Sequence, residues 1–117
     1  MGAPVVHFEI TGRDVKKLHS FYSELFDWRI NSDNPLNYGM IEAQSDKSIG
    51  GGIAEAAKGS PSHATFYVEV ADPKAVLKRA EKMGGKIVVP VTEIPNMVTF
   101  AMFTDPEGHL IGLVKSM

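Results

Sequence analysis

The sequence reads VVHFEITGRDVKKL over residues 5–18 and HATFYVEVADPKAV over residues 63–76. Superposing Asp14 on Asp72, an offset of 58 positions, keeps the apolar positions of the two stretches in register. Each stretch alternates apolar and polar residues and changes to helical spacing after the aspartate, which predicts a strand followed by an N-capped helix. Because similarity at a fixed spacing indicates duplicated structural units, we interpret the chain as two copies of one module.

The remainder of each half predicts three further strands. We expect them at residues 28–30, 38–43 and 49–54 in the first half, and at 86–90, 99–103 and 110–114 in the second. Module one then spans residues 4–57 and module two residues 63–115, joined by a small, polar, proline-containing linker. We expect a single α+β domain over residues 1–117, in which two tandem βαβββ modules form a curved mixed sheet around a central cleft.

The composition narrows the class of protein and of partner. The chain has 117 residues, 44% of them hydrophobic and 22% charged, with a formal net charge of −2. A chain without a basic excess is not expected to bind nucleic acid. The absence of cysteine excludes disulfides and thiolate chemistry. Since no signal peptide and no membrane-spanning apolar run are apparent, we expect a cytoplasmic protein without a membrane partner.

The parity of each module's first strand predicts which side chains meet a ligand. If the helix covers the apolar face of the strand, His7 and Glu9 point into the cleft, and Thr65 and Tyr67 do so from module two. Concave, partly apolar clefts are where proteins bind small molecules, so we expect a small organic molecule there. The residues predicted to line the cleft are His7, Glu9, Thr65, Tyr67, Met102 and Gly112.

Motifs in both halves, covering essentially the whole chain, are similar to those of one known family. They are the run from Asp14 to Tyr22, Leu25-Phe26-Asp27-Trp28, Val68 to Asp72, Met83-Gly84-Gly85-Lys86, and the run from Phe103 to His109. Together they resemble the glyoxalase and bleomycin-resistance proteins, also called the vicinal oxygen chelate superfamily, with its extradiol dioxygenase-like members. The resemblance implies paired βαβββ modules that hold a divalent metal between them.

The same resemblance places the metal ligands on the first and last strands of each module. His7 occupies the first of these positions, but the matching residue of module two is Thr65, a weak donor. The last strand has Gly112 where a glutamate is expected, and residues 50–54 contain no donor side chain. Because a metal site needs about three protein ligands, we expect no cofactor and no bound metal. A weak, non-standard divalent site using His7, Glu9 and a donor such as His63 is the alternative.

Two functional hypotheses stay open. The first is a metal-free binding protein for a small organic molecule, which we expect to be a homodimer. The second is a glyoxalase-related lyase or isomerase in which His7 and Glu9 are catalytic and carry protons. A structural alternative for His7 is a cavity-lining histidine hydrogen-bonded to Tyr67 or Glu9. We expect His19 to be solvated and His109 to stabilise its turn.

Overall fold

The computed structural model describes residues 2–116, which form two compact units. The N-terminal unit is His7–Ala64. The C-terminal unit begins at Thr65 and also includes the first residues of the chain, up to Val6. Glu69 N donates to Pro4 O at 2.9 Å, which fixes those first residues to the C-terminal unit.

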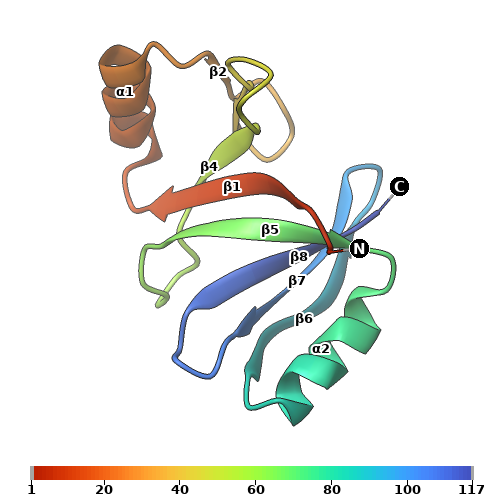
Figure 1. Ribbon diagram of the computed structural model, residues 1–117. Helices are drawn as coiled ribbons and strands as arrows, with labels where there is room; N and C mark the ends of the chain where they lie inside the picture. The colour runs from red at the N-terminus through yellow and green to blue at the C-terminus, as the bar shows by residue number, and fades with distance from the viewer. Residues whose placement is uncertain (1, 117) are drawn as a thin grey trace. The chain divides into compact units, whose positions relative to one another are not determined.

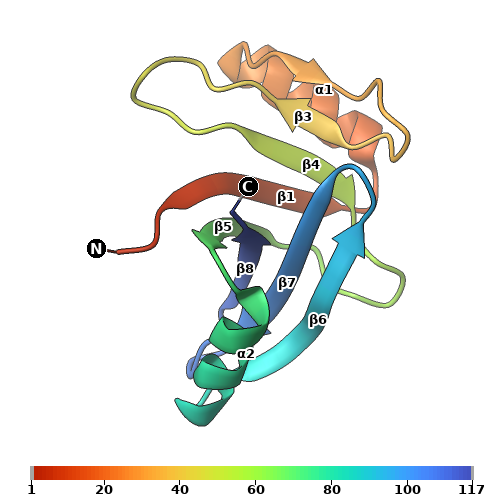
Figure 2. The same ribbon diagram turned by 90° about the vertical axis from the view of Figure 1, so that its right-hand side faces the viewer.

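The N-terminal unit has one helix and a four-stranded sheet (Figure 1). Its elements are β1 (Val5–Gly12), α1 (Val15–Phe26), β2 (Ile30–Asn31), β3 (Gly39–Ile41) and β4 (Gly51–Glu55). The strand order is β2-β3-β4-β1, in which β1 and β4 are parallel and the other neighbours antiparallel. Figure 2 shows α1 beside β3 and β4.

The C-terminal unit repeats this topology. Its elements are β5 (Ala64–Val70), α2 (Pro73–Lys82), β6 (Lys86–Ile94), β7 (Val98–Thr104) and β8 (Leu110–Lys115). The strand order is β6-β7-β8-β5, and β5 and β8 are again the parallel pair. The predicted α+β class with two βαβββ modules is confirmed.

The two predicted N-caps form as expected. Asp14 accepts a hydrogen bond from Lys17 N at 3.1 Å, and Asp72 accepts one from Ala75 N at 3.2 Å. After α2, Gly84 has a φ of +103°, the left-handed conformation that ends a helix without strain only at glycine. The strand limits were less well predicted, because β3 is short and β6 continues to Ile94 through irregular pairing.

The two helices are buried to different extents. In the C-terminal unit, Leu77 of α2 packs with Ala101 and Leu113 of the sheet as the core. No residue of α1 is buried, and three of its large apolar side chains are about half exposed: Phe21 55%, Leu25 58% and Phe26 53%. The prediction that α1 covers the apolar face of β1 is therefore only partly correct.

Trp28 contacts both α1 and β1. Its ring lies 5.6 Å from that of Phe8 and 5.5 Å from that of Tyr22, measured between centroids. Phe8 in turn packs over Gly51, where a side chain would stand 2.5 Å from the phenyl ring. Phe8 is thus on the helix side of the sheet. Because side chains alternate along a strand, His7 and Glu9 leave β1 on the opposite face.

Candidate functional site

The hydroxyl of Tyr38 lies between the two polar side chains of β1. It donates a hydrogen bond to Glu9 Oε2 at 2.9 Å and lies 2.9 Å from His7 Nε2. The rings of His7 and Tyr38 are stacked, with centroids 6.1 Å apart. The two residues predicted to carry protons therefore meet at one tyrosine.

The single proton of the Tyr38 hydroxyl fixes the tautomer of His7. Because that proton is donated to Glu9, the tyrosine oxygen accepts from His7, and we assign a hydrogen to His7 Nε2. In neutral His7 the basic lone pair is then on Nδ1. Protons are donated along one direction, from His7 to Tyr38 and from Tyr38 to the Glu9 carboxylate.

His63 contacts the other oxygen of the same carboxylate. Its Nε2 lies 3.3 Å from Glu9 Oε1, and both side chains are mostly buried. Two hydrogen bonds with Thr11 hold the backbone of His63: Thr11 N donates to His63 O at 2.8 Å, and His63 N donates to Thr11 Oγ1 at 3.0 Å. A histidine that could have been a mobile loop residue is thus fixed beside Glu9.

The side chain of Asn34 fixes the backbone of Tyr38 at both ends. Its Nδ2 donates to Tyr38 O at 2.6 Å, and its Oδ1 accepts from Tyr38 N at 2.9 Å. The same Oδ1 accepts from Leu36 N at 3.2 Å. One amide therefore closes the loop before β3, and Asn34 is a positioning residue for Tyr38.

Burial lowers the pKa of His7 below its ordinary value of 6.5, and the charge of Glu9 opposes this shift without cancelling it. The imidazole is therefore neutral near pH 7. A neutral imidazole beside a tyrosine and a carboxylate can accept a proton from a bound molecule.

The other predicted site residues lie in the C-terminal unit. Tyr67, Gly112 and Met102 are paired in a row across β5, β8 and β7, and the Tyr67 hydroxyl donates to Met102 Sδ at 3.9 Å. Thr65 is buried, and its hydroxyl donates to the backbone oxygen of Leu110. The role of these four residues in lining a ligand site stays a prediction.

A tyrosine ring covers a glycine of the last strand in each unit. Gly52 of β4 pairs with Glu9, and Gly112 of β8 pairs with Tyr67, so the two glycines are equivalent. A Cβ at Gly52 would overlap the ring of Tyr38, and one at Gly112 would overlap the ring of Tyr67. Both positions must therefore remain glycine for the rings to lie where they do.

These last strands are also where the resemblance to known proteins places metal-ligating carboxylates. A glycine offers no donor, and the tyrosine ring takes the space in which a longer side chain would extend. Within residues 2–116, no three His, Asp or Glu side chains are grouped so that they could hold a metal ion. The residues present do not fit the divalent metal of those proteins.

A cavity of about 580 Å³ lies beside Tyr38 in the N-terminal unit. Its lining comes from α1, the loop before β3 and the end of β4: Val15, Lys16, His19, Ser32, Leu36, Asn37, Tyr38, Ala54 and Glu55. His19 Nε2 is buried there, and no residue in the described part of the chain hydrogen-bonds to it. The prediction of a solvated His19 is therefore wrong.

His109, in the C-terminal unit, does stabilise its turn, with Nδ1 3.0 Å from Asp105 Oδ2.

The repeated topology agrees with the results of comparison with known proteins. The family model described as "Glyoxalase/Bleomycin resistance protein/Dioxygenase superfamily" matches residues 5–113. The chain belongs to this superfamily. Its glyoxalase-type fold is the two βαβββ modules described above.

Three similar proteins show how far the likeness extends. A glyoxylase-like domain-containing protein of Didymella fabae is 32% identical over 114 residues, covering 86% of this chain and 84% of that protein. The CFP32 protein of Mycobacterium tuberculosis is 30% identical over 79 residues, which cover 68% of this chain but only 30% of CFP32. A superfamily member from Vibrio splendidus 12B01 has the same fold, with a TM-score of 0.63 at 17% identity, covering 98% of this chain and all of that one.

Two site residues of this glyoxalase-type chain escaped the sequence analysis. Tyr38 was predicted only as a strand residue. It has the parity of Met40, which pairs with Gly52 beside Glu9, but this register is known only from the structure. Asn34 lies in a turn cluster, where an asparagine that bonds its own loop has no distinct signature.

No helix within residues 2–116 is long and apolar enough to cross a membrane.

Proposed function

We propose that this glyoxalase-superfamily protein binds a small, partly apolar organic molecule against the sheet face that carries His7, Glu9 and Tyr38, without a resident divalent metal. One observation carries the proposal: Tyr38 lies over Gly52, on the strand where a ligating side chain would otherwise extend. An aromatic ring with a polar tip favours a flat organic molecule over a metal ion, because stacking and a few hydrogen bonds can act together.

The polar groups of this face suit a ligand with at least one hydroxyl or carbonyl group. Glu9 accepts a hydrogen bond from Tyr38, and His63 lies 3.3 Å from its second oxygen. Neutral His7 adds a basic nitrogen. A ligand that stacks on the Tyr38 ring can donate hydrogen bonds to these groups or accept them. None of the groups then lacks a hydrogen-bond partner when the ligand is bound.

The test is binding of 2-naphthol, a flat, fluorescent molecule with one hydroxyl group, to the whole chain. We expect saturable binding that Tyr38→Phe and Glu9→Gln weaken by about tenfold, the size of one charge-assisted hydrogen bond. Tyr22→Phe is the matched control, since Tyr22 lies in the aromatic cluster of α1 and should leave affinity unchanged. Equal affinity in all variants would contradict this site.

Metal content tests the second half of the proposal. Elemental analysis of the purified protein should find no stoichiometric Ni, Zn, Mn or Fe, and titration with these ions should not raise the melting temperature in a saturable way. One equivalent of tightly held metal that Glu9→Gln releases would disprove the metal-free proposal.

A second candidate, a lyase- or isomerase-type enzyme, is favoured by the hydrogen bonds that link neutral His7 to Tyr38 and Tyr38 to Glu9. In it, His7 removes a proton next to a carbonyl group. Dihydroxyacetone in D₂O is a simple probe: its C–H signals should disappear faster with the protein than with buffer, and this excess should be lost in His7→Ala. Exchange at the buffer rate with the unmodified protein would exclude this reaction for the probe and favour the binding protein.

We also propose that the protein is a homodimer. The half-exposed side chains of Phe21, Leu25 and Phe26 make an apolar surface on α1 of the kind that protein interfaces cover. Light scattering coupled to size exclusion should give twice the chain mass, and Leu25→Glu should give the monomer mass. A monomer at all concentrations would contradict the proposal.

A further inference from the structure

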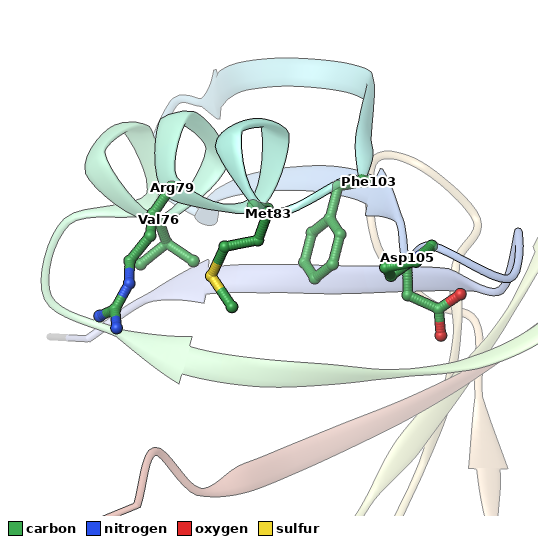
Figure 3. Close-up of a pocket in the computed structure, with 8 residues that line it drawn as sticks. Val76, Arg79, Met83, Phe103 and Asp105 are labelled. Carbon is green, nitrogen blue, oxygen red and sulfur yellow. The ribbon is translucent and has the colours of Figure 1, made fainter.

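The C-terminal unit contains a second cavity, of about 320 Å³, where the last turn of α2 meets the end of β7 (Figure 3). Its walls are mainly apolar: Val76, Ala80, Met83, Phe103 and Pro106. Figure 3 shows Met83 between Val76 and Phe103, with Arg79 and Asp105 at opposite ends of this row. None of these residues belongs to the set around Tyr38.

Two successive glycines follow α2, and the second of them, Gly85, lines this cavity. Gly84 has a φ of +103° and turns the chain back from α2 toward β6. At Gly85, a Cβ would stand 2.6 Å from Thr104 O and 3.1 Å from Ala80 O, so the chain can pass there only without a side chain. The turn therefore places no side chain of its own among the apolar walls.

Met83, at the rim, is 68% exposed and is the most exposed large apolar side chain among the described residues. Exposing a thioether chain beside an unfilled apolar cavity costs free energy that a bound apolar group would recover. Methionine is also the side chain that adapts most easily to an irregular ligand surface. The rim is thus suited to closing over an aliphatic chain.

The two charged residues of the lining differ in what is available to a ligand. The Asp105 carboxylate accepts from Glu107 N at 2.9 Å and from His109 N at 2.9 Å, and it also pairs with the His109 ring. Arg79 is exposed and is in neither of the ion pairs found among the described residues. The cavity therefore offers a ligand the positive charge of Arg79, whereas the Asp105 carboxylate is already hydrogen-bonded within its own turn.

We propose that this cavity is a separate binding site for a free aliphatic monocarboxylate, with the carboxylate on the Arg79 guanidinium and the chain along Val76, Met83 and Phe103. Guanidinium binds carboxylate through two parallel hydrogen bonds, which gives the ligand a fixed orientation. The apolar walls then select for chain length. Each added methylene should tighten binding by about fourfold until the cavity is filled.

The experiment is a titration of the ¹⁵N-labelled whole chain with octanoate below its micelle concentration, followed by the amide resonances. We expect saturable shifts confined to α2, the Gly84-Gly85 turn and the end of β7. Hexanoate should bind more weakly than octanoate. 1-Octanol should bind at least tenfold more weakly, and octyltrimethylammonium should not bind. Equal binding of octanoate and octyltrimethylammonium, or shifts spread over both units, would overturn the proposal.

Arg79→Gln should weaken octanoate binding at least tenfold, and Lys82→Gln, a neighbouring α2 cation outside the lining, should change it less than twofold. In Met83→Gln, octanoate and hexanoate should both bind more weakly and with similar affinities, because the apolar rim is lost. Unchanged octanoate affinity in Arg79→Gln disproves the site. Since the comparison of octanoate with 1-octanol uses the unmodified protein, the proposal stays testable if a variant folds poorly. Failure here leaves 2-naphthol binding at Tyr38 unaffected.

Discussion

Tyr38 lies across Gly52, and this places its hydroxyl 2.9 Å from Glu9 Oε2. The ring can take this position only because Gly52 has no side chain. The pairing of a glycine on the last strand with a tyrosine over it recurs at Gly112 and Tyr67. In both units, a strand position that could carry a donor side chain is instead a glycine covered by an aromatic ring.

Replacing Gly52 by alanine should displace the Tyr38 ring. The new methyl group would overlap the ring, so the ring must move and its bond to Glu9 must break. We expect a loss of about 1–3 kcal/mol in the free energy of unfolding, measured by urea denaturation. Gly2→Ala is the control, because a Cβ there meets nothing within 4 Å. A Gly52→Ala protein as stable as the Gly2→Ala control would show that the ring does not depend on the glycine.

Removing only the hydroxyl of Tyr38 should separate the polar role of this residue from its aromatic role. In Tyr38→Phe the ring still covers Gly52, but Glu9 loses a donor and His7 Nε2 loses its acceptor. We expect the unfolding free energy to fall by about 1–2 kcal/mol, because two partly buried groups are left without that partner. A change no greater than that of Tyr22→Phe would contradict the assigned hydrogen bonds.

Asn34→Ala should weaken the same site from a distance. The side chain of Asn34 holds both the N–H and the carbonyl of Tyr38, and alanine removes both bonds. We expect about 1–2 kcal/mol lower stability and weaker 2-naphthol binding in the same direction as Tyr38→Phe. Asn34→Asp keeps the acceptor and loses the donor, so its stability and 2-naphthol affinity should lie between those of the unmodified protein and of Asn34→Ala. If Asn34→Ala left 2-naphthol affinity unchanged, the loop would not position Tyr38.

Acid should destabilise the protein through His7. Its pKa is lowered in the folded state, so the unfolded chain binds the proton more readily. This contribution to stability is present above the unfolded pKa, about 6.5, and is lost as the pH falls through the lower folded pKa. Urea denaturation from pH 8 to pH 5 should show a decline below about pH 6.5 that is smaller in His7→Asn. Parallel curves for the two proteins would exclude His7 as the cause.

The sequence by itself determined the duplicated architecture. The register between the stretches around Asp14 and Asp72 and their N-caps were readable, because strand parity and capping are local properties. The same parity placed His7 and Glu9 on one face of β1, which the hydrogen bonds of Tyr38 bear out. Membership of the glyoxalase superfamily followed from motifs spread along the chain.

Only the tertiary structure decided which partners those side chains have. Tyr38 reaches Glu9 across 29 positions of sequence, and His63 reaches it across 54, through a loop and a linker whose course no local pattern predicts. The sequence also did not predict the incomplete burial of α1 or the buried nitrogen of His19. Amphipathic spacing shows which side chains can be buried, but it does not show how much surface a small unit has to cover them. Local rules therefore determined the elements, and long-range packing determined the site.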